Sequence, residues 1–300
     1  MTTRIIANTE LGHIADNERA SIAIYEYGAA MPHRETARIA LDERAAGGGG
    51  EIHLDVYPAR GSNDTMLGSG KARGTVVFVG GLSAHALQYA TFLSRLAGRG
   101  WNVVALDVRG HGRSSGRRGD FTMPMLLDDF RGMIAYATER FGGPVAFMGS
   151  SLGGYYGLVA ANALDGIAVG VSHWIFDPAT SVTKKDARMK PIALALNKVW
   201  PTLRMNTRGV ANWDAVNESA ELRARMYQDP LMTWKYTVRA LAGGMTYSPR
   251  RPLNDLKVPH LVVIGAEDQM TPTQYTRKAF DDLQGDKTFT VIPKAGHMGG

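Results

Sequence analysis

The sequence predicts an α/β fold, in which a mostly parallel central sheet is flanked by helices and carries one helical insertion. Four continuous apolar runs, at 75–81, 101–108, 144–149 and 259–265, are typical of strands buried on both faces of a parallel sheet. Segments with a helical spacing of apolar residues separate these runs, and strands alternating with helices indicate this fold class. The alternation is interrupted once, at 177–253, which predicts the insertion.

The chain should begin with an arm followed by antiparallel strands. Residues 1–19 are polar and weakly patterned, and we expect them to form the N-terminal arm. The segment Ser21–Gly28 predicts a strand, and two more are predicted at 36–43 and 51–57, where apolar and polar residues alternate. The glycines at 47–50 predict a flexible hairpin loop, since no phosphate-binding pattern surrounds them.

Helices are predicted to pack on the sheet and to form a lid. The segments 86–100 and 123–143 each gather their apolar residues on one helical face, which indicates packing against the sheet. The interrupting segment 177–253 is mostly helical in pattern, and we expect it to be a lid over the carboxyl edge of the sheet. The α/β core would then consist of residues 20–176 and 254–300.

Composition limits the class of protein. A chain of 300 residues with 44% hydrophobic and 21% charged residues suits a soluble globular protein with a large core. No apolar window approaches the roughly 18 residues that a transmembrane helix needs, and the N-terminus lacks the apolar segment of a signal peptide. Cysteine is absent, which excludes disulfides and thiolate metal sites and suits a reducing compartment. A cytoplasmic protein is expected.

The net charge of +6 raises the question of an anionic partner. The basic residues are spread along the chain, with the densest groups at 109–118 and 184–190, and no nucleic-acid-binding module is recognisable. We therefore expect no nucleic-acid partner. The basic residues of the lid favour transient contact with anionic lipid surfaces. The pattern leaves the oligomeric state open.

The sequence Gly-Ser-Ser-Leu-Gly at 149–153 lies between a predicted buried strand and a helix. This is the G-x-S-x-G turn in the context that it requires, a sharp passage from strand to helix. Gly149 and Gly153 would avoid collisions with neighbouring backbone in so tight a turn. Ser151 at the apex is the candidate nucleophile, while Ser150 should point elsewhere. The alternative is that the serines only cap the helix.

A nucleophilic serine needs a general base, and the base needs an orienting acid. In folds with this turn the three follow in the order serine, acid, histidine. Asp268 lies just past the last buried strand, with Glu267 as the rival acid, and His297 lies just past the following strand. Because both loops should lie at the same edge of the sheet, we predict Ser151, Asp268 and His297 as the catalytic residues.

Two backbone N–H groups should stabilise the oxyanion that forms during acyl transfer. One would come from Leu152, directly after the nucleophile. The other would come from Leu82, in the loop after the strand at 75–81, where Gly81 would let the backbone approach the substrate closely. The alternative for this loop is an ordinary turn from strand to helix.

Together these motifs resemble the α/β-hydrolases, and within them the monoacylglycerol lipase and lysophospholipase group. The similarity extends from Glu51 to His297 and is most specific at 80–120 and at 227–231, the sequence Tyr-Gln-Asp-Pro-Leu. The resemblance implies the same triad and the same two oxyanion donors. It also implies substrate contacts from Gly81 and from family-like positions, His85 and Tyr89.

The lid is expected to line an apolar acyl pocket. Trp200 and Trp213 are the predicted contacts, with further apolar residues nearby at Met205, Met226, Met232 and Trp234. The alternative for each of these residues is an ordinary place in the core of the lid. No metal or organic cofactor is expected.

The sequence departs from the family pattern at several positions. Gly80 and Ser150 stand where the family usually has histidine. Ala84 and Gln88 replace an acidic residue and an arginine that are common in the oxyanion loop, which argues against the usual recognition of a glycerol head group but not against hydrolysis. The chain stops three residues after His297, where the family adds a final helix, so we expect a C-terminal truncation.

The function predicted is a serine hydrolase that cleaves carboxylic esters with an apolar tail, such as monoacylglycerols or lysophospholipids, through an acyl-enzyme intermediate. Thioesterase, acyltransferase, peptidase or cofactor-free lyase chemistry on the same triad remains open, and so does a non-catalytic protein that binds a ligand in the same pocket. Dehalogenases and epoxide hydrolases are disfavoured, because they need aspartate at the position of Ser151.

Overall fold

A computed structural model gives the arrangement of most of the chain. It describes residues 12–26, 31–41, 49–61, 65–67, 71–176, 184–209, 211–247 and 249–298. The N-terminal arm is therefore described only from Gly12 onward, and residues 47 and 48 of the glycine loop at 47–50 lie outside the described residues.

The centre of the molecule is an eight-stranded sheet with the strand order β1-β2-β4-β3-β5-β6-β9-β10. Strands β1 and β2 form an antiparallel hairpin, and β2 also pairs antiparallel with β4, whereas every other pairing is parallel. This confirms the predicted mostly parallel sheet and the antiparallel start. The strands are Glu35–Leu41 (β1), Gly50–Tyr57 (β2), Gly74–Val79 (β3), Trp101–Leu106 (β4), Val145–Ser150 (β5), Ile167–His173 (β6), His260–Gly265 (β9) and Lys287–Ile292 (β10).

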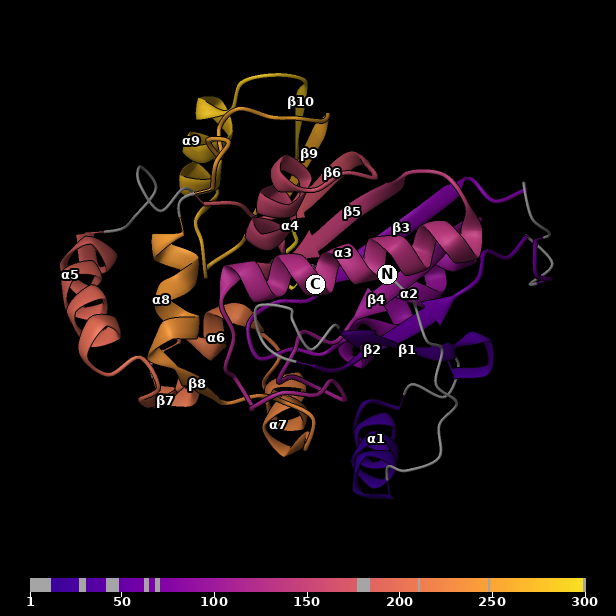
Figure 1. Cartoon of the computed structure of the whole chain (residues 1–300), viewed down its shortest axis with the longest axis horizontal. Coiled ribbons are helices and arrows are strands. Elements are labelled where there is room, and N and C mark those ends of the chain that lie inside the picture. Colours follow the sequence, from indigo (N-terminus) through magenta and orange to yellow (C-terminus); the bar gives the residue numbers. More distant parts are fainter. Residues whose placement is uncertain are drawn as a thin grey trace.

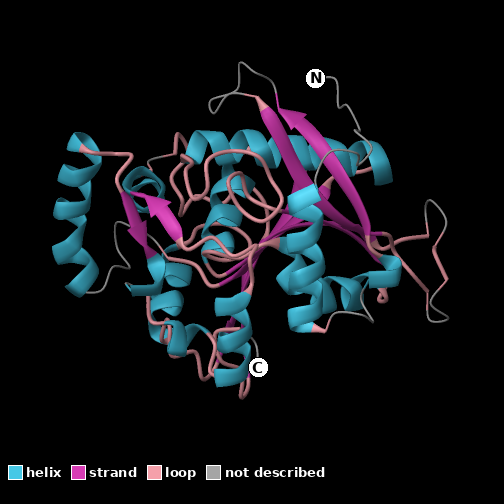
Figure 2. Ribbon diagram, turned by 90° about the horizontal axis from the view of Figure 1, so that it is seen from below, coloured by secondary structure: helices cyan, strands magenta, loops and turns pink. Residues whose placement is uncertain are grey.

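Helices cover both faces of the sheet, as Figures 1 and 2 show. In β4, Val104 and Leu106 pack in one core with residues of helices α3 and α4, whereas Val103 and Ala105 pack in a second core with helix α2. Successive side chains of a strand point to opposite faces, so a strand covered on both faces needs a continuous apolar run. The flanking helices are η3 (Ala86–Tyr89), α2 (Ala90–Ala97), α3 (Met123–Phe141), α4 (Leu152–Ala163) and α9 (Thr273–Asp282).

Strand β6 had no counterpart among the predicted elements. It contains Gly170, and a glycine inside a strand weakens the apolar pattern by which strands are recognised. The structure explains this glycine: a Cβ atom there would overlap the imidazole of His260 on the neighbouring strand β9. The close packing of β6 on β9 therefore requires glycine at position 170, and this glycine interrupts the apolar pattern by which the strand would be recognised.

The predicted strand at Ser21–Gly28 is wrong. Residues up to Tyr25 belong to helix α1 (Gly12–Tyr25). Ile22 packs against the core that contains Leu87, and Tyr25 packs against a cluster in the insertion, so the two lie on one helical face three residues apart. The apolar residues here alternate as in a strand over a few positions only, and contacts with the rest of the fold favour the helix.

The elements between β6 and β9 fall in the segment 177–253, where the insertion is predicted; residues 177–183, 210 and 248 of this segment lie outside the described residues. The segment is mostly helical, with one short antiparallel pair of strands, and Figure 1 shows α5 and α8 side by side at one end of the molecule. Its elements are α5 (Lys184–Val199), β7 (Arg204–Asn206), η4 (Thr207–Gly209), α6 (Trp213–Val216), α7 (Ala220–Gln228), β8 (Lys235–Thr237) and α8 (Val238–Thr246). None of the helices that the structure describes has the length and apolar character to cross a membrane.

A buried ionic network joins α1 to the sheet. The guanidinium of Arg113 is fully buried and contacts Asp55 (2.7 Å), Asp107 (3.0 Å) and Glu18 of α1 (3.0 Å). Arg34 bonds both Asp55 (2.7 Å) and Glu18. Burial alone would raise the pKa of Asp55, but the charges of Arg113 and Arg34 outweigh burial and hold that pKa well below its usual value. The carboxylates are therefore charged in the fold and depend on the two arginines.

We expect Arg113→Ala to lower the free energy of unfolding by about 3–5 kcal/mol, because it leaves buried carboxylates without their partner. Urea denaturation measures this change. Arg131→Ala is the matched control, since its pair with Asp128 (2.5 Å) is half exposed and its loss should cost no more than about 0.5 kcal/mol. Equal midpoints for the two variants would contradict the prediction.

Candidate active site

The turn between β5 and α4 holds Ser151 in a strained conformation. Its φ of 53° and ψ of −125° lie in a region that residues other than glycine rarely adopt. The turn is also crowded: a Cβ atom at Gly149 would overlap the carbonyl oxygen of Gly153, and one at Gly153 would overlap that of Val79. Strand β5 and helix α4 therefore cross so closely that glycine is needed at both ends of the turn, at 149 and 153. Ser151 lies at the apex of this turn.

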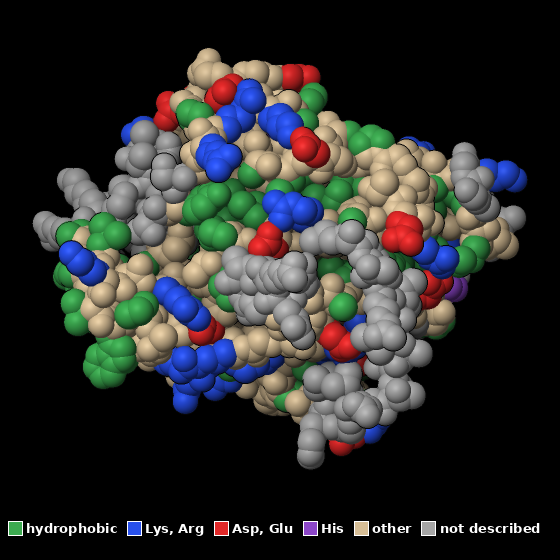
Figure 3. All heavy atoms as spheres, viewed as in Figure 1, with side chains coloured by type: hydrophobic (Ala, Val, Ile, Leu, Met, Phe, Trp, Pro, Cys, Tyr) green, Lys and Arg blue, Asp and Glu red, His purple; other side chains and the backbone are tan. Residues whose placement is uncertain are grey.

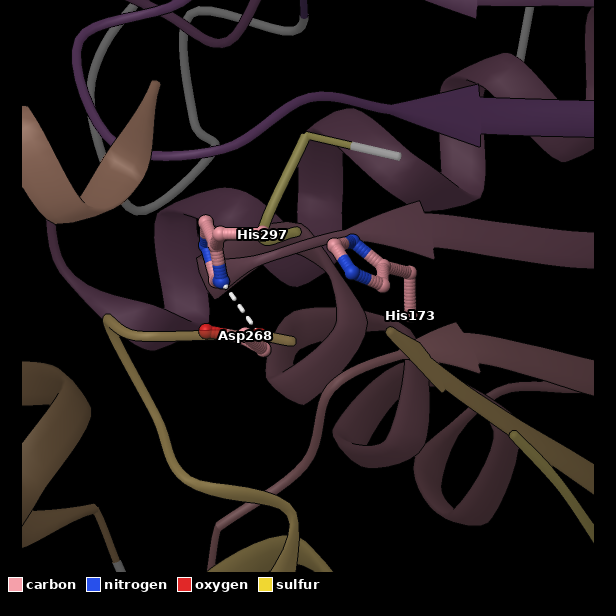
Figure 4. Close-up of side chains that lie close together, drawn as sticks. All are labelled: His173, Asp268 and His297. Atoms are coloured by element: carbon pink, nitrogen blue, oxygen red, sulfur yellow. Dashed lines mark hydrogen bonds and ion pairs between the residues drawn. The ribbon is translucent and has the colours of Figure 1, made fainter. Parts of the chain in front are cut away.

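Ser151, His297 and Asp268 form an unbroken chain of hydrogen bonds. The Ser151 hydroxyl donates to Nε2 of His297 (2.8 Å), and Nδ1 of His297 donates to Oδ2 of Asp268 (2.8 Å), the bond drawn in Figure 4. The other oxygen of Asp268 accepts from the backbone N–H of Thr271 (2.8 Å), which fixes the carboxylate. Asp268 and His297 are buried while Ser151 is partly exposed, so the chain of bonds leads from the interior to an accessible hydroxyl.

The rival acid is placed elsewhere. Glu267 is exposed and takes no part in this chain of bonds, although it directly precedes Asp268. The loop after β9 carries one carboxylate inward and the other outward. The structure thus brings together the three residues that the sequence order singled out and leaves the alternative acid in solvent.

The loop after β3 lies against Ser151. A Cβ atom at Gly81 would come within 3.0 Å of the Cβ of Ser151, so this loop backbone borders the serine directly. In the part of the chain that the structure describes, the N–H of Leu82 has no hydrogen-bond acceptor. Leu152 is the first residue of α4, where an N–H has no partner within the helix. Both predicted oxyanion donors are thus available beside Ser151.

The same loop is anchored to its surroundings on both sides. Gly81 donates its N–H to the hydroxyl of Tyr89 (3.1 Å), and Ser83 donates its N–H to the hydroxyl of Tyr236 in β8 (2.7 Å). These bonds hold the loop from the core and from the insertion, and leave the N–H of Leu82 between them. A donor whose position is fixed in this way needs no reorganisation when charge develops on a substrate.

A pocket of about 430 Å³ opens beside Ser151 and His297. The core contributes Gly81, Leu82, Ala84, Gln88 and Tyr89 to its lining. The insertion contributes five apolar residues and three polar ones: Ala211, Trp213, Val216, Leu222 and Met226, with Asn217, Glu218 and Ser219. Met270, Gly296 and Met298 come from the loops that carry the acid and the histidine, and Tyr25 comes from α1. The accessible hydroxyl therefore faces a space suited to an apolar group.

Two of the predicted substrate contacts lie outside this pocket, which corrects the prediction for them. His85 is buried and its Nε2 lies 2.7 Å from Oδ2 of Asp229, so it ties the loop after β3 to the insertion. Trp200 follows α5 with 58% of its surface exposed and does not line the pocket. Tyr89 and Trp213 do line it, although each also packs in a core.

His173 is a residue of the site that the sequence pattern did not reveal. It ends β6 opposite Ser150 of β5, and its Nδ1 lies 3.4 Å from the Ser150 hydroxyl. Its ring centroid is 5.3 Å from that of His297, and Figure 4 shows the two imidazoles side by side. Burial lowers the pKa of His173 to about 4, and the neighbouring His297 adds to this effect. No sequence pattern indicated His173, because the strand on which it lies, β6, was not predicted.

Ligand atoms of His173, Asp268 and His297 all lie within 4.8 Å of one another, a spacing that could hold a metal ion. Both ring nitrogens of His297 are already engaged, one by Asp268 and one by Ser151. An ion bound through His297 would therefore have to break the chain of hydrogen bonds. The donor set is better matched to proton transfer than to metal binding.

Comparison with known proteins identifies the family. Residues 70–299 match the family described as serine aminopeptidase, S33. A monoacylglycerol lipase of Mycolicibacterium smegmatis is 30% identical over 241 residues, which cover 75% of this chain and 81% of that protein. The chain belongs to this family of α/β-hydrolases.

Two further relatives show the breadth of this family. The proline iminopeptidase PfmaB of Pestalotiopsis fici is 24% identical over 241 residues, or 72% of this chain and 82% of that protein. A soluble variant of the monoglyceride lipase of Saccharomyces cerevisiae has the same fold, with a TM-score of 0.66, 19% identity, and coverage of 83% of this chain and 84% of that one. The predicted resemblance and the hydrolase fold are thereby confirmed.

We expect His173 to make stability fall as the pH is lowered from about 6.5 to about 4. Its folded pKa of about 4 lies below the usual value of about 6.5, so the unfolded chain binds the proton more readily in this window. Between pH 8 and pH 5 this one group should remove about 2 kcal/mol from the free energy of unfolding.

His173→Asn cannot take up that proton, so its unfolding free energy should depend less steeply on pH. Denaturant titrations of both proteins at pH 8 and pH 5 make the comparison. A variant with the same pH dependence as the wild type would show that His173 is not a buried neutral group.

Proposed function

We propose that this hydrolase cleaves carboxylic esters with an apolar acyl group, using Ser151, His297 and Asp268 as a catalytic triad. The observation that carries the proposal is the hydrogen-bonded chain of these three residues, which ends at an accessible hydroxyl on an apolar pocket. An intact set of this kind argues against a protein that only binds a ligand, because a binding site has no use for a serine bonded to a buried acid through histidine.

The geometry suggests the role of each residue. Nε2 of His297 accepts the proton of Ser151 as the oxygen attacks the ester carbonyl, and Asp268 holds the imidazole in the required tautomer and stabilises its positive charge. The N–H groups of Leu82 and Leu152 would receive the oxyanion. His297 then protonates the leaving alcohol, and water attacks the acyl-enzyme in the same way. No metal or organic cofactor takes part in these steps.

The lining of the pocket supports the proposed substrate class. Its wall from the insertion is mostly apolar, which favours an acyl chain over a charged group. The Mycolicibacterium smegmatis relative is named a monoacylglycerol lipase, and we propose monoacylglycerols or lysophospholipids as the substrates here. Ala84 and Gln88 line the pocket, and the family resemblance implies an acidic residue and an arginine at these positions, so we propose that the polar head group is held differently.

Peptidase activity is the second candidate, because the Pestalotiopsis fici relative is named a proline iminopeptidase. The same triad would attack an amide, but a free amino terminus needs a counter-charge in the pocket. Glu218 lines the pocket and could supply one. Assaying an ester panel beside N-terminal prolyl and alanyl amides separates the two activities.

We further propose that the insertion at 177–253 acts as a lid that touches anionic lipid surfaces. Large apolar side chains are exposed on and after α5, at Ile192 (57%), Leu194 (42%), Val199 (82%) and Trp200 (58%). The insertion also carries exposed basic residues: Lys198, Arg204, Arg208 and Lys235. Figure 3 shows basic and hydrophobic side chains close together on this face of the molecule. The absence of cysteine supports a location in a reducing compartment such as the cytoplasm.

The triad assignment predicts that Ser151→Ala lowers kcat for p-nitrophenyl octanoate by about 10⁴-fold or more and abolishes labelling by a fluorophosphonate probe. Asp268→Asn should lower kcat by about 10³–10⁴-fold, because the imidazole loses its orienting partner. Glu267→Gln is the matched control and should keep kcat within about twofold, since surface carboxylates contribute little. A larger loss from Glu267→Gln than from Asp268→Asn would show that the acid is wrongly assigned.

The lid proposal predicts binding to vesicles that contain phosphatidylglycerol, with weaker binding to pure phosphatidylcholine and a decrease as salt is raised. Val199→Ser with Trp200→Ser should reduce the sedimented fraction several-fold, because the exposed apolar residues no longer insert. Met66→Ser, which changes an exposed apolar residue (61%) outside the insertion, is the control. Wild-type protein that stays in the supernatant at low salt would refute this contact.

A further inference from the structure

One wall of the pocket comes from a part of the chain outside the family match. Residues 70–299 match the family, whereas Tyr25, at the end of α1, lines the pocket beside the core and the insertion. Because Tyr25 lies outside the segment matched to the family, its side chain can make the substrate range of this hydrolase differ from that of its relatives.

Contacts on two sides fix the position of Tyr25. Its hydroxyl accepts a hydrogen bond from Nε2 of Gln88 (2.9 Å), a residue that also lines the pocket. Its ring packs against the apolar cluster of the insertion, which contains Trp213, Met226 and Met232. Tyr25 therefore spans the pocket boundary from η3 to the insertion, and both ends of the side chain are held.

Helix α1 itself is fastened to the core, so this wall is part of the folded structure. Ile22 packs against the core cluster around Leu87. Glu18 is paired with Arg34 and with the fully buried Arg113. Burial alone would raise the pKa of Glu18, but Arg113 and Arg34 lower it, so this carboxylate is charged at neutral pH. A charged and an apolar contact, one helical turn apart, thus prevent α1 from moving away.

We propose that Tyr25 is a specificity-determining residue, whose ring limits the length of the acyl group that the pocket accepts. This inference rests on the proposed ester hydrolysis. The acyl chain lies along the apolar wall of Trp213 and Met226, and Tyr25 packs against the same cluster where that wall meets α1. A longer chain would have to displace the ring from its packing against this cluster.

The test measures kcat/KM for p-nitrophenyl esters from butanoate to hexadecanoate. For the wild type we expect an increase from butanoate to octanoate and a decrease beyond it. In Tyr25→Ala the ratio of kcat/KM for dodecanoate to that for octanoate should rise about tenfold, because a few added methylenes find new apolar space. Tyr25→Phe keeps the ring and should leave this ratio within about twofold of wild type.

Two further variants make the test decisive. Tyr25→Trp enlarges the ring and should move the optimum to shorter esters, the opposite direction to Tyr25→Ala. Tyr227→Ala removes a tyrosine that packs in the insertion without lining the pocket, and its profile should match the wild type. Thermal unfolding of each variant shows whether it is folded; if Tyr25→Ala does not fold, the shift in Tyr25→Trp decides the outcome.

The possible failures can be told apart. Wild-type protein that neither hydrolyses these esters nor reacts with a fluorophosphonate at Ser151 would overturn the proposed function. If the wild type is active and labelled, but folded Tyr25→Ala and Tyr25→Trp both keep its chain-length profile, only the role of Tyr25 is refuted. Opposite shifts in the two variants, with labelling of Ser151 retained, support it.

Discussion

The close crossing of β5 and α4 is the constraint on which the site depends. Because there is no room for a side chain at Gly149 or Gly153, the backbone must turn sharply and Ser151 takes a strained conformation. The same turn sets the N–H of Leu152 at the start of α4 and brings Ser150 opposite His173. One steric condition thus positions the proposed nucleophile, one proposed oxyanion donor and a neighbouring imidazole.

The parallel sheet supplies the rest of the site. Strands β9 and β10 run in the same direction as β5, so the loops after them end at the same edge, and these loops carry Asp268 and His297. Residues separated by 146 positions, Ser151 and His297, meet there within hydrogen-bond distance. The insertion and α1 then contribute walls of the pocket at this edge.

Local patterns predicted what depends on local physics. Strands buried on both faces need continuous apolar runs, and the turn at Ser151 needs its glycines, so both could be found in the sequence. The strand predicted at Ser21–Gly28 failed because a short alternation fits either element until its packing partners are known. Strand β6 and His173 were missed because Gly170, which leaves room for the imidazole of the neighbouring His260, weakens the apolar pattern of the strand. The burial of His85 with Asp229 and the exposure of Trp200 depend on contacts between distant segments, which no local pattern records.

The attachment of α1 has a consequence for how such enzymes diversify. The proposed catalytic residues lie in the segment matched to the family, whereas one boundary of the pocket comes from the preceding helix α1, in which Glu18, Ile22 and Tyr25 contact the rest of the fold. Changes in that helix need not disturb the strained turn or the buried acid. Substitutions in α1 can therefore alter the substrate range while the proposed catalytic residues stay unchanged.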